Sequence, residues 1–572
     1  MREKSLLYTF EALVNSLLRE FIELETIKTS SEDNFIEFTN KKMETLRVEL
    51  AIYSILGKHQ YNLNHKIDNK PVEIEKSLEW IINYSCEVMN QSDMEQITSF
   101  KDRVHQSQTN IQTFLEDLGE GIESDYKKTL NFIEAESLLI LGHSFHPYPK
   151  ARDGFNKEDF KNYSPEYRQS FSLAWAIADQ DVVLEKHEKD FDSTWINAIA
   201  IECLGAAEVE KLTKNNKKLV PIHPWQLSHI RNNHFVRDLE SKNKISFFHK
   251  ESKIKWISTS SIRSIYSKDC KYMLKFSMSL RLTNSIRHLQ QVEVDRGIQV
   301  SDVFKTDEGI RLQEKWKKFK VLHEPAYAAL KNEKGETAID SIVSCRMNPF
   351  IKGEEESTVL LATLNQTSPK GRSILDNYTQ REDSSYFVDW FTEFTKVVIT
   401  PLLDSQANFG IFLGAHQQNI ILKLNNNGFP TNLFFRDCQG TGYSEEGFKQ
   451  YSPYSKEMAL DNGNILTPEL GQKIFCYYLI INTAFDTISH LSKISGQNET
   501  IFLHILNKSI RALKENGVKD SSCIDYLLNE QYLWVKGNYK CCLKEINENT
   551  MTSPADIYIP INNPIKGAAS NV

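Results

Sequence analysis

Residues 258–289 read STSSIRSIYSKDCKYMLKFSMSLRLTNSIRHL, and they carry the clearest secondary-structure pattern of the chain. From Tyr272 to Thr283 apolar and polar residues alternate, with Met273 as the exception. A period of two predicts a β-strand with an apolar back and a front of cations and hydroxyl groups. Thr283 is then predicted to begin a helical turn, which would bring Arg287 onto the same face four residues later. The middle of the chain is therefore expected to be built on sheet.

The polar front of this predicted strand carries groups that bind anions. It presents Lys275, and Arg287 follows just beyond it, while the upstream loop Ser260–Ser264 adds hydroxyl groups and the guanidinium of Arg263. Guanidinium donors match phosphate and carboxylate oxygens, and each hydrogen bond to a charged group contributes about 1.5–3 kcal/mol. Arg263, Lys275 and Arg287 together could hold a triphosphate. The alternative is a half-buried sheet whose charged face is simply solvated.

Farther along the chain, residues 416–440 read HQQNIILKLNNNGFPTNLFFRDCQG and predict a β-hairpin. Ile420–Leu424 and Asn432–Arg436 are the expected strands, and Asn425–Gly428 has the composition of a tight turn. Because the strands of a hairpin run antiparallel, the residues just outside them are expected to lie together at its open end.

The open end of this hairpin carries side chains of a metal site. Asn419 and Asp437 lie almost equally far from the turn, so an amide oxygen and a carboxylate meet there, with His416 beside them. Mg²⁺ favours such oxygen ligands and usually keeps several waters and substrate phosphates. Protein kinases place their metal-binding Asn and Asp around a hairpin in a similar way. Gly414 stands where a carboxylate would be useful, so the pattern leaves open a working site, a weakened site or ordinary core.

A third concentration of chemistry is the stretch GHSFHPYPKARDGF at residues 142–155. Its two prolines and two glycines exclude a regular helix and predict a stiff loop. This loop holds His143, His146, Lys150 and Arg152 close together. Two imidazoles and two permanent cations suit a polycarboxylate or a phosphate. The alternative is a solvated basic loop without a ligand.

The bulk composition describes an ordinary globular protein. Its 572 residues are expected to hold roughly three to four domain-sized units. The formal net charge of −8 argues against a nucleic-acid partner. The nine cysteines never form C-x-x-C, so reduced thiols are expected rather than disulfides or a zinc site. The start of the chain fits an amphipathic helix, and no apolar run reaches ~18 residues, so we expect no membrane span and a cytoplasmic location.

Changes in the local sequence pattern divide the chain into three regions of an α+β protein. Residues 1–130 alternate helical patterns with polar turns and are expected to form a mainly helical lobe. Residues 131–300 carry short strands, Pro/Gly loops and dense histidine and arginine. Residues 301–572 return to helical patterns around the predicted hairpin.

In this order, the blocks resemble the NRPS-independent siderophore (NIS) synthetase family, also called the aerobactin synthetase or IucA/IucC family. The family pattern G-H-P-x-H-P-x-x-K-x-R-x-G-F is matched at residues 142–155, with Ser144 in place of the first proline. The motifs H-P-W-Q, S-x-R-T, E-A-H-x-Q-N and R-D-x-x-G and a closing Asn-Pro element are similar to residues 223–226, 261–264, 414–419, 436–440 and 558–565. Each motif alone is weak, but the ordered set is highly specific.

The resemblance implies an ATP-dependent ligase of siderophore biosynthesis that uses ATP and Mg²⁺. Such an enzyme activates a carboxylate of citrate, or of a related acid, as an acyl-adenylate, and an amine of the polyamine or amino-acid type then displaces AMP. The implied fold is a cupped hand of thumb, fingers and palm, formed here by residues 1–130, 131–300 and 301–572, with a distantly kinase-like palm. A homodimer is left open as its assembly, and no nucleic-acid or membrane partner is implied.

Carried over position by position, the resemblance also implies roles for particular residues. ATP would be bound by Ser261, Arg263, Ser264, Lys275, His416, Asn419 and Asp437, and the last two would coordinate Mg²⁺. The acid substrate would contact His143, His146, Thr283 and Arg287. Arg287, His416 and His146 are the implied catalytic residues. A tricarboxylate and a triphosphate repel each other, so cations between them and fixed donors for the developing charge are chemically required.

Two departures from the family pattern concern the nucleotide site. Ser264 replaces a threonine and keeps the hydroxyl group, at a change in burial of roughly 0.8 kcal/mol. Gly414 removes a carboxylate that the family uses at the metal. Water could fill this position and leave an active enzyme, which is the interpretation we favour, or the site is impaired and the protein only binds. The alternatives to a citrate ligase are therefore the same chemistry on 2-oxoglutarate or a citryl or succinyl conjugate, and a non-catalytic nucleotide- or metabolite-binding relative.

Overall fold

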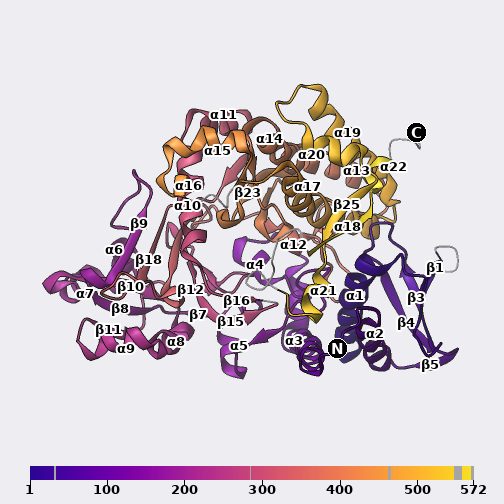
Figure 1. Cartoon of the computed structure of the whole chain (residues 1–572), viewed down its shortest axis with the longest axis horizontal. Helices are drawn as coiled ribbons and strands as arrows, with labels where there is room; N and C mark the ends of the chain where they lie inside the picture. The colour runs from indigo at the N-terminus through magenta and orange to yellow at the C-terminus, as the bar shows by residue number, and fades with distance from the viewer. Residues whose placement is uncertain (31–33, 284, 461–464, 547–556, 568–572) are drawn as a thin grey trace.

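The structure, a computed structural model, describes residues 1–30, 34–283, 285–460, 465–546 and 557–567. Helices and sheets are mixed throughout this part of the chain, as the α+β expectation requires. In Figure 1 an N-terminal sheet lies at the right, a smaller sheet with short helices lies at the far left, and C-terminal helices lie at the upper right. Within these residues all nine cysteines are free and buried, and no helix is both long and apolar enough to cross a membrane.

The N-terminal region combines long helices with a sheet that the sequence analysis did not anticipate. Helix α1 (Arg2–Phe21) buries Leu6, Phe10 and Leu13, as its amphipathic pattern predicts. There follow the antiparallel strands β1 (Ile27–Ser30), β2 (Phe35–Thr39), β3 (Thr45–Ile52), β4 (Gln60–Ile67) and β5 (Lys70–Val72), and then α2 (Ile74–Val88) and α3 (Met94–Asp125). Buried and half-buried residues alternate along β2 and β3, so the period-two signal is present in strands too short to stand out between the helices.

The middle of the chain forms three sheets. One has the strand order β10-β8-β11, with α6 and α7 packed on β10 and α9 on β11, and another has the order β7-β12-β13-β14-β19-β18-β9. A small third sheet has the order β16-β15-β6. The strands are β6 (Arg152–Asp153), β7 (Ser170–Phe171), β8 (Ala174–Asp179), β9 (Val183–His187), β10 (Lys217–Ile222), β11 (Ile245–His249), β12 (Trp256–Ser258), β13 (Ser264–Tyr266), β14 (Tyr272–Phe276), β15 (Met278–Leu282), β16 (Ser285–Arg287), β18 (Ala326–Leu330) and β19 (Val343–Met347).

The helices of this middle region are short and lie mostly at its outer side (Figure 1). They are α4 (Phe132–Ser137), α5 (Lys157–Tyr163), α6 (Trp195–Leu204), α7 (Ala206–Leu212), α8 (Leu227–Asn232) and α9 (His234–Ser241). With the sheets they enclose a hydrophobic core that contains Trp175, Trp195 and Trp256. A rigid sheet therefore stands behind the residues that the sequence singled out.

The single strand predicted from Tyr272 to Thr283 is wrong in one respect, because the chain changes sheets at Ser277. β14 is buried along its whole length inside the seven-stranded sheet, whereas β15 pairs with β16 and β6. The Ser277 side chain accepts a hydrogen bond from the backbone N–H of Leu289 at 2.8 Å and so holds this break. The predicted helical turn is also wrong, since Thr283 has a φ of 55° and lies in the tight turn that joins β15 to β16.

The C-terminal region packs helices around a four-stranded sheet of order β17-β23-β22-β20. The predicted hairpin is confirmed, because β22 (Ile420–Leu424) pairs antiparallel with β23 (Pro430–Phe435) and Ile420 lies opposite Phe435. The other strands are β17 (Phe319–Val321), β20 (Thr358–Leu360), β21 (Ile411–Phe412) and β24 (Gly442–Tyr443). The helices are α10 (Gln291–Phe304), α11 (Asp307–Lys315), α12 (Leu361–Leu364), α13 (Ser384–Phe394), α14 (Thr400–Phe409), α15 (Glu445–Tyr451), α16 (Lys456–Leu460), α17 (Pro468–Cys476), α18 (Phe485–Ser495), α19 (Glu499–Glu515), α20 (Ser522–Asn529) and α22 (Pro564–Gly567).

The last part of the chain returns to the N-terminal region. β25 (Tyr532–Lys536) pairs with β26 (Tyr558–Asn562), and between them α21 (Asn538–Leu543) packs on α1 and α3. Glu20 of α1 accepts hydrogen bonds from the first backbone N–H groups of α21, at 2.6 Å from Tyr539 and 3.0 Å from Lys540. This contact places the C-terminal segment against the loop that follows α4.

Candidate functional site

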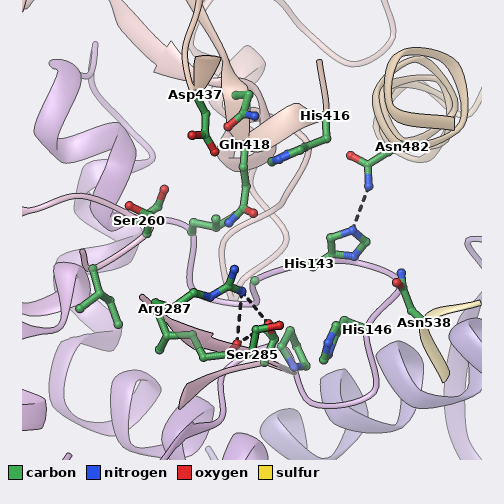
Figure 2. A pocket seen from close by; sticks show the side chains of 18 of the residues that line it. His143, His146, Ser260, Ser285, Arg287, His416, Gln418, Asp437, Asn482 and Asn538 are labelled. Atoms are coloured by element: carbon green, nitrogen blue, oxygen red, sulfur yellow. Dashed lines mark hydrogen bonds between the residues drawn. The ribbon is translucent and has the colours of Figure 1, made fainter. Parts of the chain in front are cut away.

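One cavity of about 330 Å³ lies between the middle and C-terminal regions, and it is lined by every residue to which the sequence analysis assigned a binding or catalytic role. These residues are His143, His146, Ser261, Arg263, Ser264, Lys275, Thr283, Arg287, His416, Asn419 and Asp437. Figure 2 shows His416, Gln418 and Asp437 on one side of the cavity, Ser285 and Arg287 across from them, and His143 and His146 at one end. Five separate segments of the chain thus converge on one space.

A buried ion pair holds the hydroxyl-rich loop at the cavity wall. Nη1 of Arg436 lies 2.6 Å from Oε1 of Glu136, and both residues also contact Ser260, through its hydroxyl at 3.2 Å and its backbone N–H at 2.9 Å. Two residues after Ser260, Ile262 is buried and has a φ of 63°, a left-handed conformation that β-branched residues rarely adopt. Such strain, on the order of 1–3 kcal/mol, is found where a site requires a particular backbone shape. Here it turns the chain so that the residues on both sides line the cavity.

Lys275 stands at the centre of a buried charge network. Its ammonium group pairs with Asp437, and it lies 3.9 Å from Oε1 of Glu324. The same oxygen of Glu324 accepts from Nε of Arg346 at 2.9 Å, and a guanidinium nitrogen of Arg346 lies 4.0 Å from Asp437. Two cations and two carboxylates therefore balance in a space from which water is largely excluded.

The electrostatics of this network keep Asp437 ionised. Burial alone would raise the pKa of its carboxyl group, but Lys275, Arg263 and Arg346 outweigh burial and hold that pKa far below its usual range. Burial lowers the pKa of Lys275, which Asp437 and Glu324 partly restore. Asp437 can consequently accept a metal at any working pH, provided that Lys275 turns toward another anion such as a phosphate.

The residues at the open end of the hairpin fit Mg²⁺ but do not form a closed metal cage. Nδ2 of Asn419 donates to the backbone oxygen of Gly414 at 3.1 Å, which leaves Oδ1 as the atom able to coordinate. In the part of the chain that the structure describes, no group of three or more His, Cys, Asp or Glu side chains could hold a metal. One carboxylate and one amide oxygen suit an ion that keeps waters and substrate phosphates as its other ligands.

Gly414 itself is not forced by packing. A Cβ atom added there would have the backbone oxygen of Gly440 as its nearest neighbour, at the ordinary contact distance of 3.5 Å. Its φ is not in the left-handed region, so a larger residue meets no backbone strain. The absent carboxylate is therefore a matter of sequence rather than of space.

The three histidines of the cavity differ in their hydrogen bonds. Nδ1 of His143 accepts from the backbone N–H of Phe145 at 3.0 Å, and its Nε2 contacts the Asn482 side chain at 2.9 Å (Figure 2). His146 likewise uses Nδ1 for the N–H of Tyr148 and Nε2 for the thiol of Cys542.

His416 differs from the other two. Among the described residues no side-chain hydrogen bond to its ring is found, and the ring packs beside Tyr478 with centroids 5.7 Å apart. Burial lowers the pKa of His143 and His416 to about 4, and Asp437 partly opposes this at His416. His416 is therefore a neutral imidazole that is free to accept a proton or to donate to an anion.

Arg287 faces the cavity from the end of β16. Its Nη2 donates to the Thr283 hydroxyl at 2.8 Å and to the backbone oxygen of Leu282 at 3.2 Å. These contacts fix the direction of the guanidinium group, which points across the cavity in Figure 2. The sequence analysis placed Thr283 and Arg287 together correctly, although through a hairpin turn rather than a helix.

Lys150 and Arg152 line the cavity but do not supply free charge, contrary to the expectation for the 142–155 loop. Both pair with the buried carboxylate of Glu166, each at 2.7 Å from Oε1. Burial would raise the pKa of Glu166, but Arg152 and Lys150 outweigh it and bring that pKa down to about 2. The two cations therefore stabilise the loop, and its two histidines remain as the groups able to meet a substrate.

Several lining residues were missed by sequence reasoning. Arg346, Asn482, Lys536 and Asn538 come from strands and helices whose local patterns are those of ordinary core or surface. Only Arg346 gave a signal, as a lone cation within the otherwise small or apolar strand β19. Lys536 and Asn538 reach the cavity because the C-terminal segment folds back, and Asn482 reaches it from the helical segment Tyr477–Ala484; no local sequence pattern indicates either placement.

Two protein-family models match this chain. The model of the IucA / IucC family matches residues 131–366, and the model described as ferric iron reductase FhuF-like transporter matches residues 388–551. N(2)-citryl-N(6)-acetyl-N(6)-hydroxylysine synthase of Vibrio mimicus is 32% identical over 96% of this chain and 94% of that protein. Spermidine-citrate ligase of Bacillus anthracis is 28% identical over 81% of this chain and 78% of that protein.

A solved structure shares the complete fold. ATP-bound aerobactin synthetase IucA from a hypervirulent pathotype of Klebsiella pneumoniae superposes with a TM-score of 0.89 and 25% sequence identity, over 98% of this chain and 99% of that chain. The same arrangement of regions therefore occurs in a protein that was solved with ATP. Sequence identity along nearly the whole length and a shared architecture lead to one conclusion: the chain belongs to the IucA/IucC family of NIS synthetases.

Proposed function

We propose that this protein is an ATP-dependent siderophore synthetase that adenylates a carboxylate of citrate and joins it to a primary amine as an amide. The observation that carries the proposal is the single cavity in which Arg263, Lys275 and Arg287 face the carboxylate and amide of Asp437 and Asn419. A triphosphate and a tricarboxylate can meet only where cations separate them. A negatively charged chain that concentrates cations at one cavity is suited to such a pair.

In the first half-reaction, ATP would lie along the wall formed by the 260–264 loop and β14. Ser261, Arg263, Ser264 and Lys275 bind its phosphates, and Mg²⁺, held by Asn419 and Asp437, neutralises charge on them when bound. An oxygen of the citrate carboxylate attacks the α-phosphorus atom, the bond to pyrophosphate breaks, and citryl-adenylate forms. Fixed donors such as a guanidinium stabilise the charge that develops in this transition state.

The acid substrate would occupy the opposite part of the cavity. Arg287 and Thr283 bind its carboxylates, with His143 and His146 at its far end. His416 lies between the two substrates. Burial lowers its pKa to about 4, which keeps the ring neutral and leaves a ring nitrogen able to accept the proton that the attacking amine must lose. His143 and His146 already use both ring nitrogens, so we assign them to positioning the acid.

For the amine we propose an amino-acid-type substrate, N(6)-acetyl-N(6)-hydroxylysine, which the name of the Vibrio mimicus relative contains. An amine that carries its own carboxylate approaches a site rich in arginine and lysine without net positive charge, whereas a polyamine such as spermidine brings additional positive charge. Citrate remains the proposed acid, with 2-oxoglutarate or a citryl or succinyl conjugate as the alternative. The proposed cupped-hand arrangement with a kinase-like palm, a cytoplasmic location and a homodimer belong to the same proposal.

A pyrophosphate-exchange assay tests this function. The purified protein is incubated with Mg²⁺, ATP and labelled pyrophosphate, and citrate, 2-oxoglutarate or a succinyl conjugate is added in turn. Citrate-dependent exchange, followed by amide formation when N(6)-acetyl-N(6)-hydroxylysine is added, is the expected result. Exchange with another acid alone would transfer the proposal to that acid. ATP binding without exchange for any acid would leave a non-catalytic binding protein as the answer.

A further inference from the structure

A second cavity of about 100 Å³ lies behind the wall of the first. It is bordered by α1, by the β3–β4 connection, by residues 365–367 and by α18, none of which touches the nucleotide end of the site. Gly142 and His143 line both cavities, so the loop that holds the acid-binding histidines is also the boundary between them.

The boundary loop is held from the side of the second cavity. The Gln366 side chain accepts from the backbone N–H of Leu141 at 3.2 Å and donates to the backbone oxygen of Gly142 at 2.8 Å. The Ser144 hydroxyl donates to Asp486 at 3.4 Å. The second cavity thus has a built wall, and a group bound in it would lie one loop away from the proposed acid substrate.

Two buried polar groups in this wall have no partner among the described residues. Nδ1 of His59 accepts from the backbone N–H of Ser54 at 3.2 Å, so in the neutral ring Nε2 carries the proton, and this donor is unpaired. Nδ2 of Asn365 donates to Gln417 and Thr487, which leaves its Oδ1 as an unpaired acceptor. Both side chains are at least nine-tenths buried. A ligand or a water that offers both functions would satisfy this donor and this acceptor.

The charges of the two cavities are also different. The main cavity is dominated by arginine and lysine, which repel an approaching ammonium group. The second cavity contains Glu11 and Lys493, and its wall holds the ion pair between Lys58 and Asp486 at 2.8 Å. Burial raises the pKa of Glu11 to about 7, a cost that a bound cation would relieve. Carboxylate and ammonium groups side by side fit a zwitterion, the form of an amino acid at neutral pH.

We propose that this second cavity binds the primary-amine substrate, with the reacting nitrogen directed to the shared edge at Gly142 and His143. This inference rests on the proposed function and adds a separate entry for the amine. The nitrogen lone pair forms the bond to the citryl carbonyl carbon, the bond from that carbon to the AMP oxygen breaks, and one proton leaves the nitrogen. His416 lines the main cavity together with Gly142 and His143, so an acceptor for that proton lies on the main-cavity side of the shared edge.

The test measures binding of the amine separately from the adenylation step. Glu11→Gln removes the carboxylate without changing shape, and Ala12→Trp, on the same helix, blocks the cavity. Glu3→Gln, on the exposed first turn of α1, is the matched control. Citrate-dependent pyrophosphate exchange needs no amine and is expected to stay within twofold of wild type in all three variants. The KM for N(6)-acetyl-N(6)-hydroxylysine is expected to rise at least tenfold in the first two and to stay unchanged in the control.

The outcomes distinguish a failure of this inference from a failure of the proposed function. If both cavity variants keep wild-type exchange and a wild-type KM for the amine, the second cavity holds water only and the inference is wrong. If Ala12→Trp lowers the melting temperature or the exchange rate, the isosteric Glu11→Gln variant alone decides. If wild-type protein shows no acid-dependent exchange at all, the proposed function fails, and the inference that rests on it fails with it.

Discussion

At the scale of single residues, the open end of the hairpin explains how a site without the family carboxylate can still be complete. Asp437 is ionised, partly accessible from the cavity and paired with Lys275, which is a cation that a phosphate can attract away. Asn419 adds an amide oxygen, and a side chain at position 414 would begin at ordinary contact distance from its neighbours. The protein therefore needs to supply only these two ligands, since Mg²⁺ accepts water in place of a missing ligand.

This view predicts opposite results for two substitutions. Asp437→Ala should lower citrate-dependent pyrophosphate exchange at least a hundredfold, because it removes the metal carboxylate and leaves Lys275 buried without its main partner. Gly414→Glu should leave exchange intact or raise it, and should lower the Mg²⁺ concentration needed for half-maximal rate. A magnesium titration of exchange in the three proteins is the measurement. Normal activity in Asp437→Ala would show that the metal is bound elsewhere.

Glu166 offers a prediction about stability rather than catalysis. It is the shared ion-pair partner of two buried cations, so Glu166→Gln should reduce the free energy of unfolding by about 3–5 kcal/mol, as measured by urea denaturation. Its pKa is lowered from the ordinary 4.5 to about 2 in the fold, so its contribution is fully present above about pH 4.5. The difference in the free energy of unfolding between wild type and Glu166→Gln should become smaller as the pH falls from 4.5 toward 2. A difference independent of pH over this range would mean that charge pairing is not its source.

At the scale of elements, the return of α21 to α1 determines the shape of the acid end of the cavity. Glu20 accepts the first N–H groups of α21, and the Asn538 side chain donates to the backbone oxygen of Phe145 at 2.9 Å. Arg19 stacks on the Phe145 ring, with 3.0 Å from the guanidinium carbon to the ring centroid. One helix end therefore holds both the C-terminal segment and the 142–155 loop.

This helix contact should respond to pH. Burial raises the pKa of Glu20 from 4.5 to about 8, although the two N–H groups, Lys540 and Arg19 oppose it. A raised pKa means that the folded protein binds a proton which the unfolded chain releases, so stability is lost as the pH rises from about 4.5 to 8. Glu20→Gln should remove this loss, giving a flatter plot of melting temperature against pH. If the plots of melting temperature against pH were parallel for wild type and Glu20→Gln, Glu20 would not be the source of the pH dependence.

At the scale of the whole molecule, the main cavity draws residues from the middle and C-terminal regions, from Leu139 to Ile557, and they include Lys536 on the returning strand β25. A nucleotide bound there would contact both regions. Ligand binding to the folded state raises stability by about 2.7 kcal/mol when the ligand is at a hundred times its dissociation constant.

MgATP should accordingly raise the melting temperature of the wild-type protein by several degrees. Lys275→Met should remove most of this shift, because it deletes the buried cation of the proposed phosphate site while keeping an apolar side chain of similar length. His234→Gln, on a helix far from the cavity, serves as the control and should keep the full shift. A full shift in Lys275→Met would place the phosphates away from β14.

Much of the site could be predicted from the sequence because the residues of each motif lie close together along the chain. The hairpin with Asn419 and Asp437, the 260–264 loop and the cation-bearing strands are local patterns of spacing and alternation, and all of them line the cavity. The break at Ser277 was not readable, since alternation continues through it and only the two partner sheets tell the halves apart. The N-terminal sheet was hidden for a similar reason, because short strands between long helices give weak periodic signals.

The sequence by itself determined which chemistry is available: cations and hydroxyl groups for phosphate, one carboxylate and one amide for a metal, and histidines for an acid substrate. Only the tertiary structure decided which of those charges are free. Lys150 and Arg152 look like the other cations of the motifs along the chain, but inside the fold both are held by the buried carboxylate of Glu166. Charge neutralisation depends on distances between residues far apart in sequence, and Coulomb interactions in a low-dielectric interior make those distances decisive.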